Sequence, residues 1–479
     1  MKKIIYSLSI LLLLFTLSIF YLSVFGFETR KFNSQIEKKV REIDKDLFIE
    51  LKEVKIILNP LNFEINLKTL GPKLKFKNNI LELENIKTQI NIKKIFGDES
   101  SLSNLEISSK AIEIKNLISF VRNINKSIEL FFLEKMIYKG YLIGDLKIEF
   151  DSDGKIKDNY SFKGLVREGN LKFLDKFDLN KINLFFSIKK NSFKFQDIKF
   201  RFENNYFSFQ ELNSIKVKDK LKINGKIENN SIKLSENVTN SIIQPYFPNI
   251  NTKGIDANFD AKFSFDLGKK YKIKNFMSNS MIKIKELNIS NNLDLEGIFP
   301  ATRKYINFNN HDISFDYDNK DFLLEGSGKF ILQPKYDEIK YFIKKEKNKY
   351  HFNKKLVLKN NLLRLKFLNY QKNENEILIM NILGSHVIGD KTEIKSFSIK
   401  EKKNSIEIEN ILLNKNFKLI NFKTAKFNYL DLKKQINKFD IERKNKKYHI
   451  DGDSFNADKI IENLTNFEKT KNWNFLNDK

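Results

Sequence analysis

Apolar and polar residues alternate one by one along most of the chain. The run from Phe259 to Leu267 is typical, because polar residues such as Asp260 and Lys262 separate its apolar side chains. Successive side chains of a β-strand point to opposite faces, so this pattern predicts a strand with one apolar face. The same pattern recurs at residues 146–150, 193–202, 282–289, 363–367 and 406–408. Few helical stretches separate these runs, so we predict a largely antiparallel, meandering sheet.

The N-terminal region departs from this pattern. Residues Ile4 to Phe27 form an almost unbroken apolar run behind Lys2 and Lys3. A helix of about 20 residues crosses a hydrocarbon core of roughly 30 Å, so the run is long enough to span a membrane. Its length, and the lack of a small-residue cleavage site at its end, favour an uncleaved anchor over the alternative of a signal peptide. Basic residues lie on both sides of the run, so charge does not decide its orientation.

Shorter amphipathic helices interrupt the predicted sheet. Their apolar residues recur at spacings of three and four, which is the period of a helix with one apolar side. We predict these helices at residues 32–44, about 115–137, about 236–244 and 458–466. Pro245 and Pro248 mark the clearest internal boundary, because proline breaks strand ladders.

These features divide the chain into four predicted segments. They are a membrane anchor (1–27), a β segment with a short leading helix (28–110), a helical insertion with a second β segment (111–244), and a C-terminal β segment ending in a short helix (245–479). The organisation is that of a mainly β protein tied once to a membrane.

Composition adds limits on function. The 479 residues carry a net charge of +26, from 86 Lys and Arg against 60 Asp and Glu. The lysines are spread through nearly every segment, which favours solubility over nucleic-acid binding. The most basic runs, 344–349 and 443–447, are interpreted as hairpin tips, with contact to anionic headgroups as the alternative. The absence of cysteine excludes disulfides, thiolate metal ligands and thiol nucleophiles.

Motifs for catalysis are absent from the sequence. The four histidines lie singly, without metal-ligand spacing, and no GxSxG elbow, P-loop or GxGxxG motif occurs. We therefore predict that the protein is not an enzyme and binds neither a metal nor a cofactor.

Four stretches give the chain a resemblance to a known family. They are residues 49–60 behind the anchor and short helix, residues 246–267, the stretch Leu324–Phe330 with Gly326 and Gly328, and residues 450–461. In order and character they resemble the AsmA-like superfamily of bacterial envelope proteins; Asn456 stands where that family usually has Asp. The resemblance implies a long, strongly curved, gutter-like β-groove whose apolar concave face holds phospholipid acyl chains. It also implies one inner-membrane anchor, with the bulk of the chain in the periplasm.

An apolar sheet face must be covered by a second sheet, by helices or by lipid. The predicted helices are too few, so a closed sandwich and a lipid-filled groove remain open. The residues proposed to line such a groove are Phe200, Phe202, Phe263, Phe265, Ile282, Ile284, Leu365 and Phe367.

The leading hypothesis is a membrane-anchored envelope protein that binds phospholipid and assists its transport from the inner to the outer membrane. Its partners would be phospholipids, the inner membrane and other envelope proteins, without nucleic acid. The alternative is a membrane-tethered periplasmic scaffold with a dry sandwich core.

Overall fold

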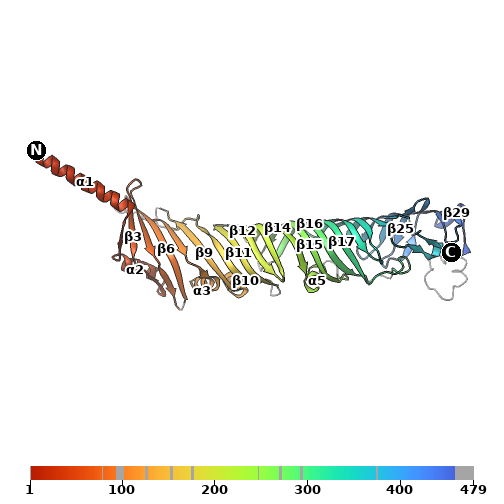
Figure 1. Ribbon diagram of the computed structural model, residues 1–479, viewed down its shortest axis with the longest axis horizontal. Coiled ribbons are helices and arrows are strands. Elements are labelled where there is room, and N and C mark those ends of the chain that lie inside the picture. Colours follow the sequence, from red (N-terminus) through yellow and green to blue (C-terminus); the bar gives the residue numbers. More distant parts are fainter. Residues whose placement is uncertain are drawn as a thin grey trace. The chain divides into compact units, whose positions relative to one another are not determined.

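The computed structural model describes residues 2–458, except 78, 93–101, 125–127, 152–154, 174–176, 219, 246–247, 269–271, 292–294 and 374–375. The protein is mainly β, with one long antiparallel sheet that is not closed and an apolar N-terminal helix (Figure 1). These features confirm the predicted fold class. The chain forms two compact units: unit 1 is Met1–Lys226 with Leu267–Tyr271, and unit 2 is Ile227–Asp266 with Lys272–Lys479.

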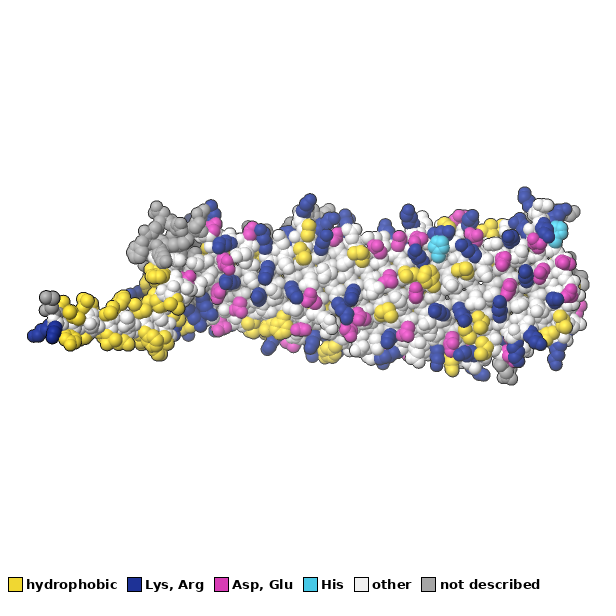
Figure 2. All heavy atoms as spheres, turned by 90° about the horizontal axis from the view of Figure 1, so that it is seen from above, with side chains coloured by type: hydrophobic (Ala, Val, Ile, Leu, Met, Phe, Trp, Pro, Cys, Tyr) yellow, Lys and Arg dark blue, Asp and Glu magenta, His cyan; other side chains and the backbone are white. Residues whose placement is uncertain are grey.

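Helix α1 (Lys2–Val24) is long and apolar enough to cross a membrane. Its 23 residues extend about 35 Å at 1.5 Å per residue, and none is buried in the protein. Figure 2 shows hydrophobic side chains along its length. Gly26 follows with a left-handed φ of 65°, and an added Cβ there would overlap the carbonyl of Ile56. Glycine therefore lets the chain turn tightly from the helix into the sheet.

Unit 1 begins with short strands and then forms a meander of long ones. Its strands are β1 (Phe27–Thr29), β2 (Leu47–Glu50), β3 (Val54–Asn59), β4 (Glu64–Leu70), β5 (Lys73–Phe76), β6 (Asn79–Asn91), β7 (Leu102–Ser109), β8 (Ile112–Glu113), β9 (Ile137–Glu149), β10 (Ser161–Phe173), β11 (Phe177–Lys189), β12 (Ser192–Phe202), β13 (Asn205–Val217) and β14 (Lys220–Leu234), which continues into unit 2. From β9 to β13 each strand pairs antiparallel with the next.

Besides α1, the described residues of unit 1 form three helices. They are α2 (Asn33–Ile43), α3 (Ile114–Ile124) and α4 (Ile128–Met136), which confirm the helices predicted at 32–44 and 115–137. Helix α3 buries Phe120 against Phe76 and Leu83 of β5 and β6. The apolar side of α3 thus covers the sheet at β5 and β6.

Unit 2 continues the meander. Its strands are β15 (Thr252–Leu267), β16 (Ile273–Ser290), β17 (Tyr305–Asp318), β18 (Asp321–Ile331), β19 (Asp337–Glu346), β20 (Lys349–Leu358), β23 (Leu378–Val387), β24 (Thr392–Glu401), β25 (Asn404–Leu413), β26 (Leu419–Asn421), β27 (Thr424–Leu430), β28 (Ile436–Lys444) and β29 (Lys447–Ser454). From β16 to β20, and on through β23, β24 and β25, neighbours pair antiparallel. Helix α5 (Glu236–Ile243) confirms the predicted helix at 236–244. Pro245, the predicted boundary, lies between α5 and β15 inside unit 2.

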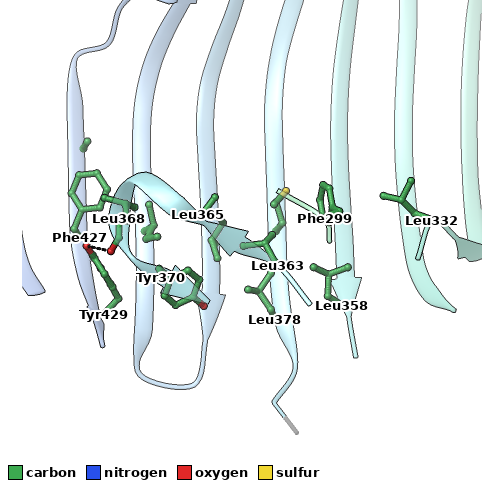
Figure 3. Close-up of a cluster of buried hydrophobic side chains, with 14 of the residues drawn as sticks. Phe299, Leu332, Leu358, Leu363, Leu365, Leu368, Tyr370, Leu378, Phe427 and Tyr429 are labelled. Atoms are coloured by element: carbon green, nitrogen blue, oxygen red, sulfur yellow. Dashed lines mark hydrogen bonds between the residues drawn. The ribbon is translucent and has the colours of Figure 1, made fainter. Parts of the chain in front are cut away.

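A separate segment crosses the main sheet of unit 2. It contains β21 (Arg364–Leu365), the short 3-10 helix η3 (Lys366–Leu368) and β22 (Tyr370–Gln371), which pairs back with β21. We call residues 359–372 the covering segment. Its Leu363, Leu365, Leu368 and Tyr370 pack on strand residues including Leu358, Leu378 and Phe427 (Figure 3).

The strand predicted at 363–367 is wrong: only Arg364–Leu365 is a strand, and Phe367 lies in η3. Asn369 turns the chain with a left-handed φ of 51°, so alternating apolar residues cover the sheet instead of extending it. The helix predicted at 458–466 lies outside the described residues after Asp458.

Candidate functional site: the apolar face of unit 2

The register of unit 2 sorts side chains onto two different faces. Ile282 of β16 pairs with Ile313 of β17, and the row continues through Gly326, Tyr341, Lys354 and Ile382. We call the face on which this row lies the apolar face. The adjacent row points the other way and is polar: Lys283, Asp312, Ser327, Lys340, Lys355 and Asn381. Figure 2 shows Lys and Arg interspersed with Asp and Glu, with only scattered hydrophobic side chains outside α1.

Burial changes along strands β20 and β23 of the apolar face. Leu358 of β20 and Leu378 of β23 are 1% and 0% exposed, because the covering segment lies over them. At the opposite ends of the same strands, Tyr350 and His386 are only half-buried. The chain thus covers one part of its apolar face and leaves another part accessible.

The accessible part carries a continuous row of ring side chains. Neighbouring ring centroids are 5.5 to 6.4 Å apart, the range of favourable ring contacts. We call the set the aromatic row: Phe263, Phe265, Phe276, Tyr317, Phe315, Phe322, Tyr350, His386 and Phe417. All of its members up to His386 are half-buried, and Phe417 is 64% exposed. The row therefore presents aromatic surface that the described residues do not cover.

The eight residues predicted to line a groove lie in different parts of the structure. Phe263 and Phe265 belong to the aromatic row. Ile282 and Ile284 lie on the same face and pack with Ala257 and Leu287 of β15 and β16. Leu365 is buried in the covering segment, whereas Phe367 is 44% exposed on it. Phe200 and Phe202 lie in unit 1, half-buried, with ring contacts to Phe207.

Sequence reasoning missed most of the aromatic row. Phe315 and Tyr317 alternate within β17, which was a usable signal. Phe276 has the polar residues Lys274 and Ser278 two positions away on either side, so alternation does not identify it. Only the pairing of strands brings their rings together.

A buried polar pair interrupts the apolar face. His311 is 1% exposed, and its Nε2 lies 3.1 Å from the hydroxyl of Tyr341. Burial lowers the pKa of His311 and raises the pKa of Tyr341 to about 12, so both side chains are neutral near pH 7. Gly326 and Gly328 make room for the pair, since an added Cβ would overlap Tyr341 or His311. The Gly-x-Gly stretch therefore has a packing role.

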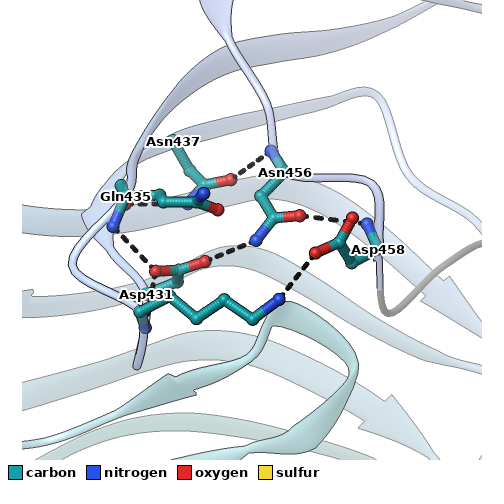
Figure 4. A network of polar contacts seen from close by, with 6 residues as sticks. Asp431, Gln435, Asn437, Asn456 and Asp458 are labelled. Carbon is teal, nitrogen blue, oxygen red and sulfur yellow. Dashed lines mark hydrogen bonds and ion pairs between the residues drawn. The ribbon is translucent and has the colours of Figure 1, made fainter.

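A second polar cluster closes the turn between β27 and β28 (Figure 4). The carboxylate of Asp431 accepts hydrogen bonds from the amides of Lys433 and Gln435 at 2.9 and 2.8 Å and from Asn456 Nδ2 at 2.7 Å. Burial alone would raise the pKa of Asp431, but these hydrogen bonds outweigh it and lower the pKa. Asn456 in turn accepts from the amide of Asp458. Protein donors satisfy this carboxylate, so the cluster ties the end of β29 to the turn between β27 and β28.

Within the part of the chain that the structure describes, no group of three or more His, Asp or Glu is arranged to hold a metal ion. Comparison with protein-family models, curated proteins and solved structures finds no significant match. The apolar face and α1 are therefore the features that bear on function.

Proposed function

We propose that this chain is a membrane-anchored envelope protein of AsmA-like type that binds phospholipid acyl chains on its apolar face and assists lipid transport from the inner to the outer membrane. In this proposal α1 is the single inner-membrane anchor and the sheet lies in the periplasm. Binding would be passive, with acyl chains on the aromatic row and headgroups in water. The partners are phospholipids and, for any directional step, other envelope proteins.

The observation that carries the proposal is the half-buried aromatic row. A buried aromatic side chain removes 150–250 Å² from water, and burial contributes roughly 25 cal/mol per Å². Each ring up to His386 keeps at most about a third of its surface exposed, which forgoes at most roughly 1–2 kcal/mol per ring, and the row repeats this over its length. An apolar partner would recover that energy, and acyl chains fit because they need no hydrogen bonds. Helix α1 supports the choice, since it would tether the chain to a membrane, which is a source of such chains.

The scaffold alternative requires a dry core. Outside the main sheet, the only sheet formed by the described residues is the two-stranded β21–β22 pair. Its segment covers Leu358 and Leu378 but leaves Tyr350 and His386 half-buried. This uneven cover favours a lipid-binding face over a sandwich core.

Site-specific photo-crosslinking tests the proposal. Benzoylphenylalanine would replace Phe263 in the aromatic row or, as the matched control, its exposed neighbour Lys262, which alternation directs to the opposite face. Irradiation in a bacterial membrane should give lipid adducts at position 263 and few at 262. Equal labelling at both positions, or none at either, would contradict an acyl-chain site on this face.

A further inference from the structure

Lys354 places a cation in the middle of the apolar face. It lies on β20 between Phe352 and Leu356 of the same face, and it pairs across the sheet with Tyr341 of β19 and Ile382 of β23. None of these four neighbours is acidic. Along β20, Lys354 therefore separates the covered end at Leu358 from the aromatic row at Tyr350.

Lys354 differs from lysines that have a carboxylate partner. Lys359 Nζ lies 2.7 Å from Glu338, and Lys400 Nζ lies 2.8 Å from Glu407. Among the described residues, Lys354 has no such ion pair, and its contact is with the face of the Phe352 ring, 5.6 Å from Nζ to the centroid. The side chain is accessible to solvent, yet the surrounding strands crowd it enough that burial lowers its pKa. No acidic group of the described residues therefore neutralises Lys354.

The carboxylates of the same face are already used. Between β17 and β24 the register places only Asp337 and Glu401 on it. Asp337 accepts hydrogen bonds from the amide of Lys359 at 2.8 Å and from Asn361 at 2.6 Å. Glu401 accepts from the Tyr370 hydroxyl at 2.7 Å. Both acids fasten the covering segment and its flanks, so neither serves Lys354.

The Tyr341 hydroxyl is also turned away from Lys354. Its ring lies over Gly326 of β18, and its hydroxyl reaches His311 of β17. Lys354 is on β20, on the other side of Tyr341. The register places the apolar side chains of Phe352, Leu356 and Ile382 next to Lys354 on this face, and the ammonium group lies over the Phe352 ring.

We propose that Lys354 binds the acidic group of an acyl amphiphile whose chain lies on the apolar face. The inference rests on the proposed function and deepens it, because it assigns a preference for anionic over neutral amphiphiles. A carboxylate or phosphate would complete the missing ion pair, and a charge-assisted hydrogen bond is stronger than one between neutral groups. Fatty acids and phosphatidic acid share this chemistry.

Paired photoreactive probes test the preference on the full chain in phosphatidylcholine nanodiscs. One probe is a diazirine fatty acid, and the other is the fatty alcohol with the same chain. The fatty acid should label residues 337–387 about tenfold more than the alcohol, a ratio equivalent to about 1.4 kcal/mol. Lys354→Met should abolish this excess but keep the labelling by the alcohol. Lys354→Arg should retain the excess.

Lys355→Met is the matched control, because Lys355 pairs with Lys340 on the opposite face. It should behave as the unaltered chain. A second pair of diazirine probes, phosphatidic acid and diacylglycerol, distinguishes phosphatidic acid from fatty acid as the source of the anion. Only the pair that contains the preferred acid should show more labelling by the acid than by its neutral counterpart.

The outcomes separate the two proposals. Equal labelling by acid and alcohol in the unaltered chain, or an excess that persists in Lys354→Met, would overturn the inference and leave acyl-chain binding intact. Absence of labelling on residues 337–387 by either probe would overturn the proposed function, and the inference with it.

Discussion

Asn456→Asp should loosen β29, because the substitution replaces a hydrogen-bond donor with a second carboxylate. Asn456 Nδ2 donates to Asp431 at 2.7 Å, and the Asn456 backbone amide donates to Asn437 at 2.8 Å (Figure 4). Aspartate has the same shape and keeps the oxygen that accepts from Asp458. The substitution therefore removes one hydrogen-bond donor and adds one negative charge while keeping the shape of the side chain.

The expected loss can be worked from these contacts. A hydrogen bond to a charged group contributes about 1.5–3 kcal/mol, and two like charges about 4 Å apart repel by about 4 kcal/mol at an effective dielectric constant near 20. Side-chain rotation relieves part of the repulsion, so we expect about 3 kcal/mol at pH 7. Asn456→Ala removes the donor without adding charge and should cost about 2 kcal/mol.

The pH dependence identifies the cause. In the unaltered chain the pKa of Asp431 is lowered, so its contribution is fully present above the ordinary carboxyl pKa and is lost as the pH falls through the lowered value. The Asn456→Asp deficit should instead shrink between pH 7 and about pH 4, because the carboxyl pair takes up a proton and regains a donor.

Hydrogen exchange of residues 436–454 measures this effect locally, which avoids assuming one unfolding transition for the whole chain. Exchange should accelerate in Asn456→Asp at pH 7 by about two orders of magnitude, and less in Asn456→Ala. Unchanged protection in Asn456→Asp would refute the view that the Asp431 cluster fastens β29.

Four further substitutions probe the apolar face. Gly326→Ala should destabilise unit 2 by about 1–3 kcal/mol, since the new Cβ must displace Tyr341; an unchanged urea midpoint would contradict this packing. Leu363 is 0% exposed, so Leu363→Ala should lower the free energy of unfolding by about 2–5 kcal/mol. Phe367 is 44% exposed in the same segment, so Phe367→Ala should lower it far less. Equal urea midpoints for the two variants would contradict the assigned burial. Phe265→Glu should reduce copurifying lipid in chains that fold, as quantified by extraction, and an unaltered lipid content would argue against the aromatic row as the site.

The sequence was most informative where structure depends on nearby residues. Strand β12 and helix α5 follow directly from local periods of two and about 3.6 residues. Alternation failed at residues 363–367, because a segment that crosses a sheet also needs apolar side chains on one side. Nothing in the local pattern distinguishes this segment from a strand of the sheet.

The candidate site depended on register, which sequence patterns do not reveal. On β17, Phe308 and His311 lie on the same face although three positions separate them, because Asn310 adopts a left-handed φ of 45° and shifts the register. Such a bulge reverses the alternation expected from the sequence. Phe263 and Phe265 could therefore be identified individually, but the aromatic row that contains them could not.

Native mass spectrometry of a chain beginning at Gly26, purified from a bacterial host without prolonged detergent exposure, tests the central claim most directly. Removal of α1 excludes lipid held by the anchor. We expect several phospholipids bound to each folded chain, with fewer on Phe265→Glu. A folded chain that carries no lipid would contradict an acyl-chain-binding face and favour the scaffold.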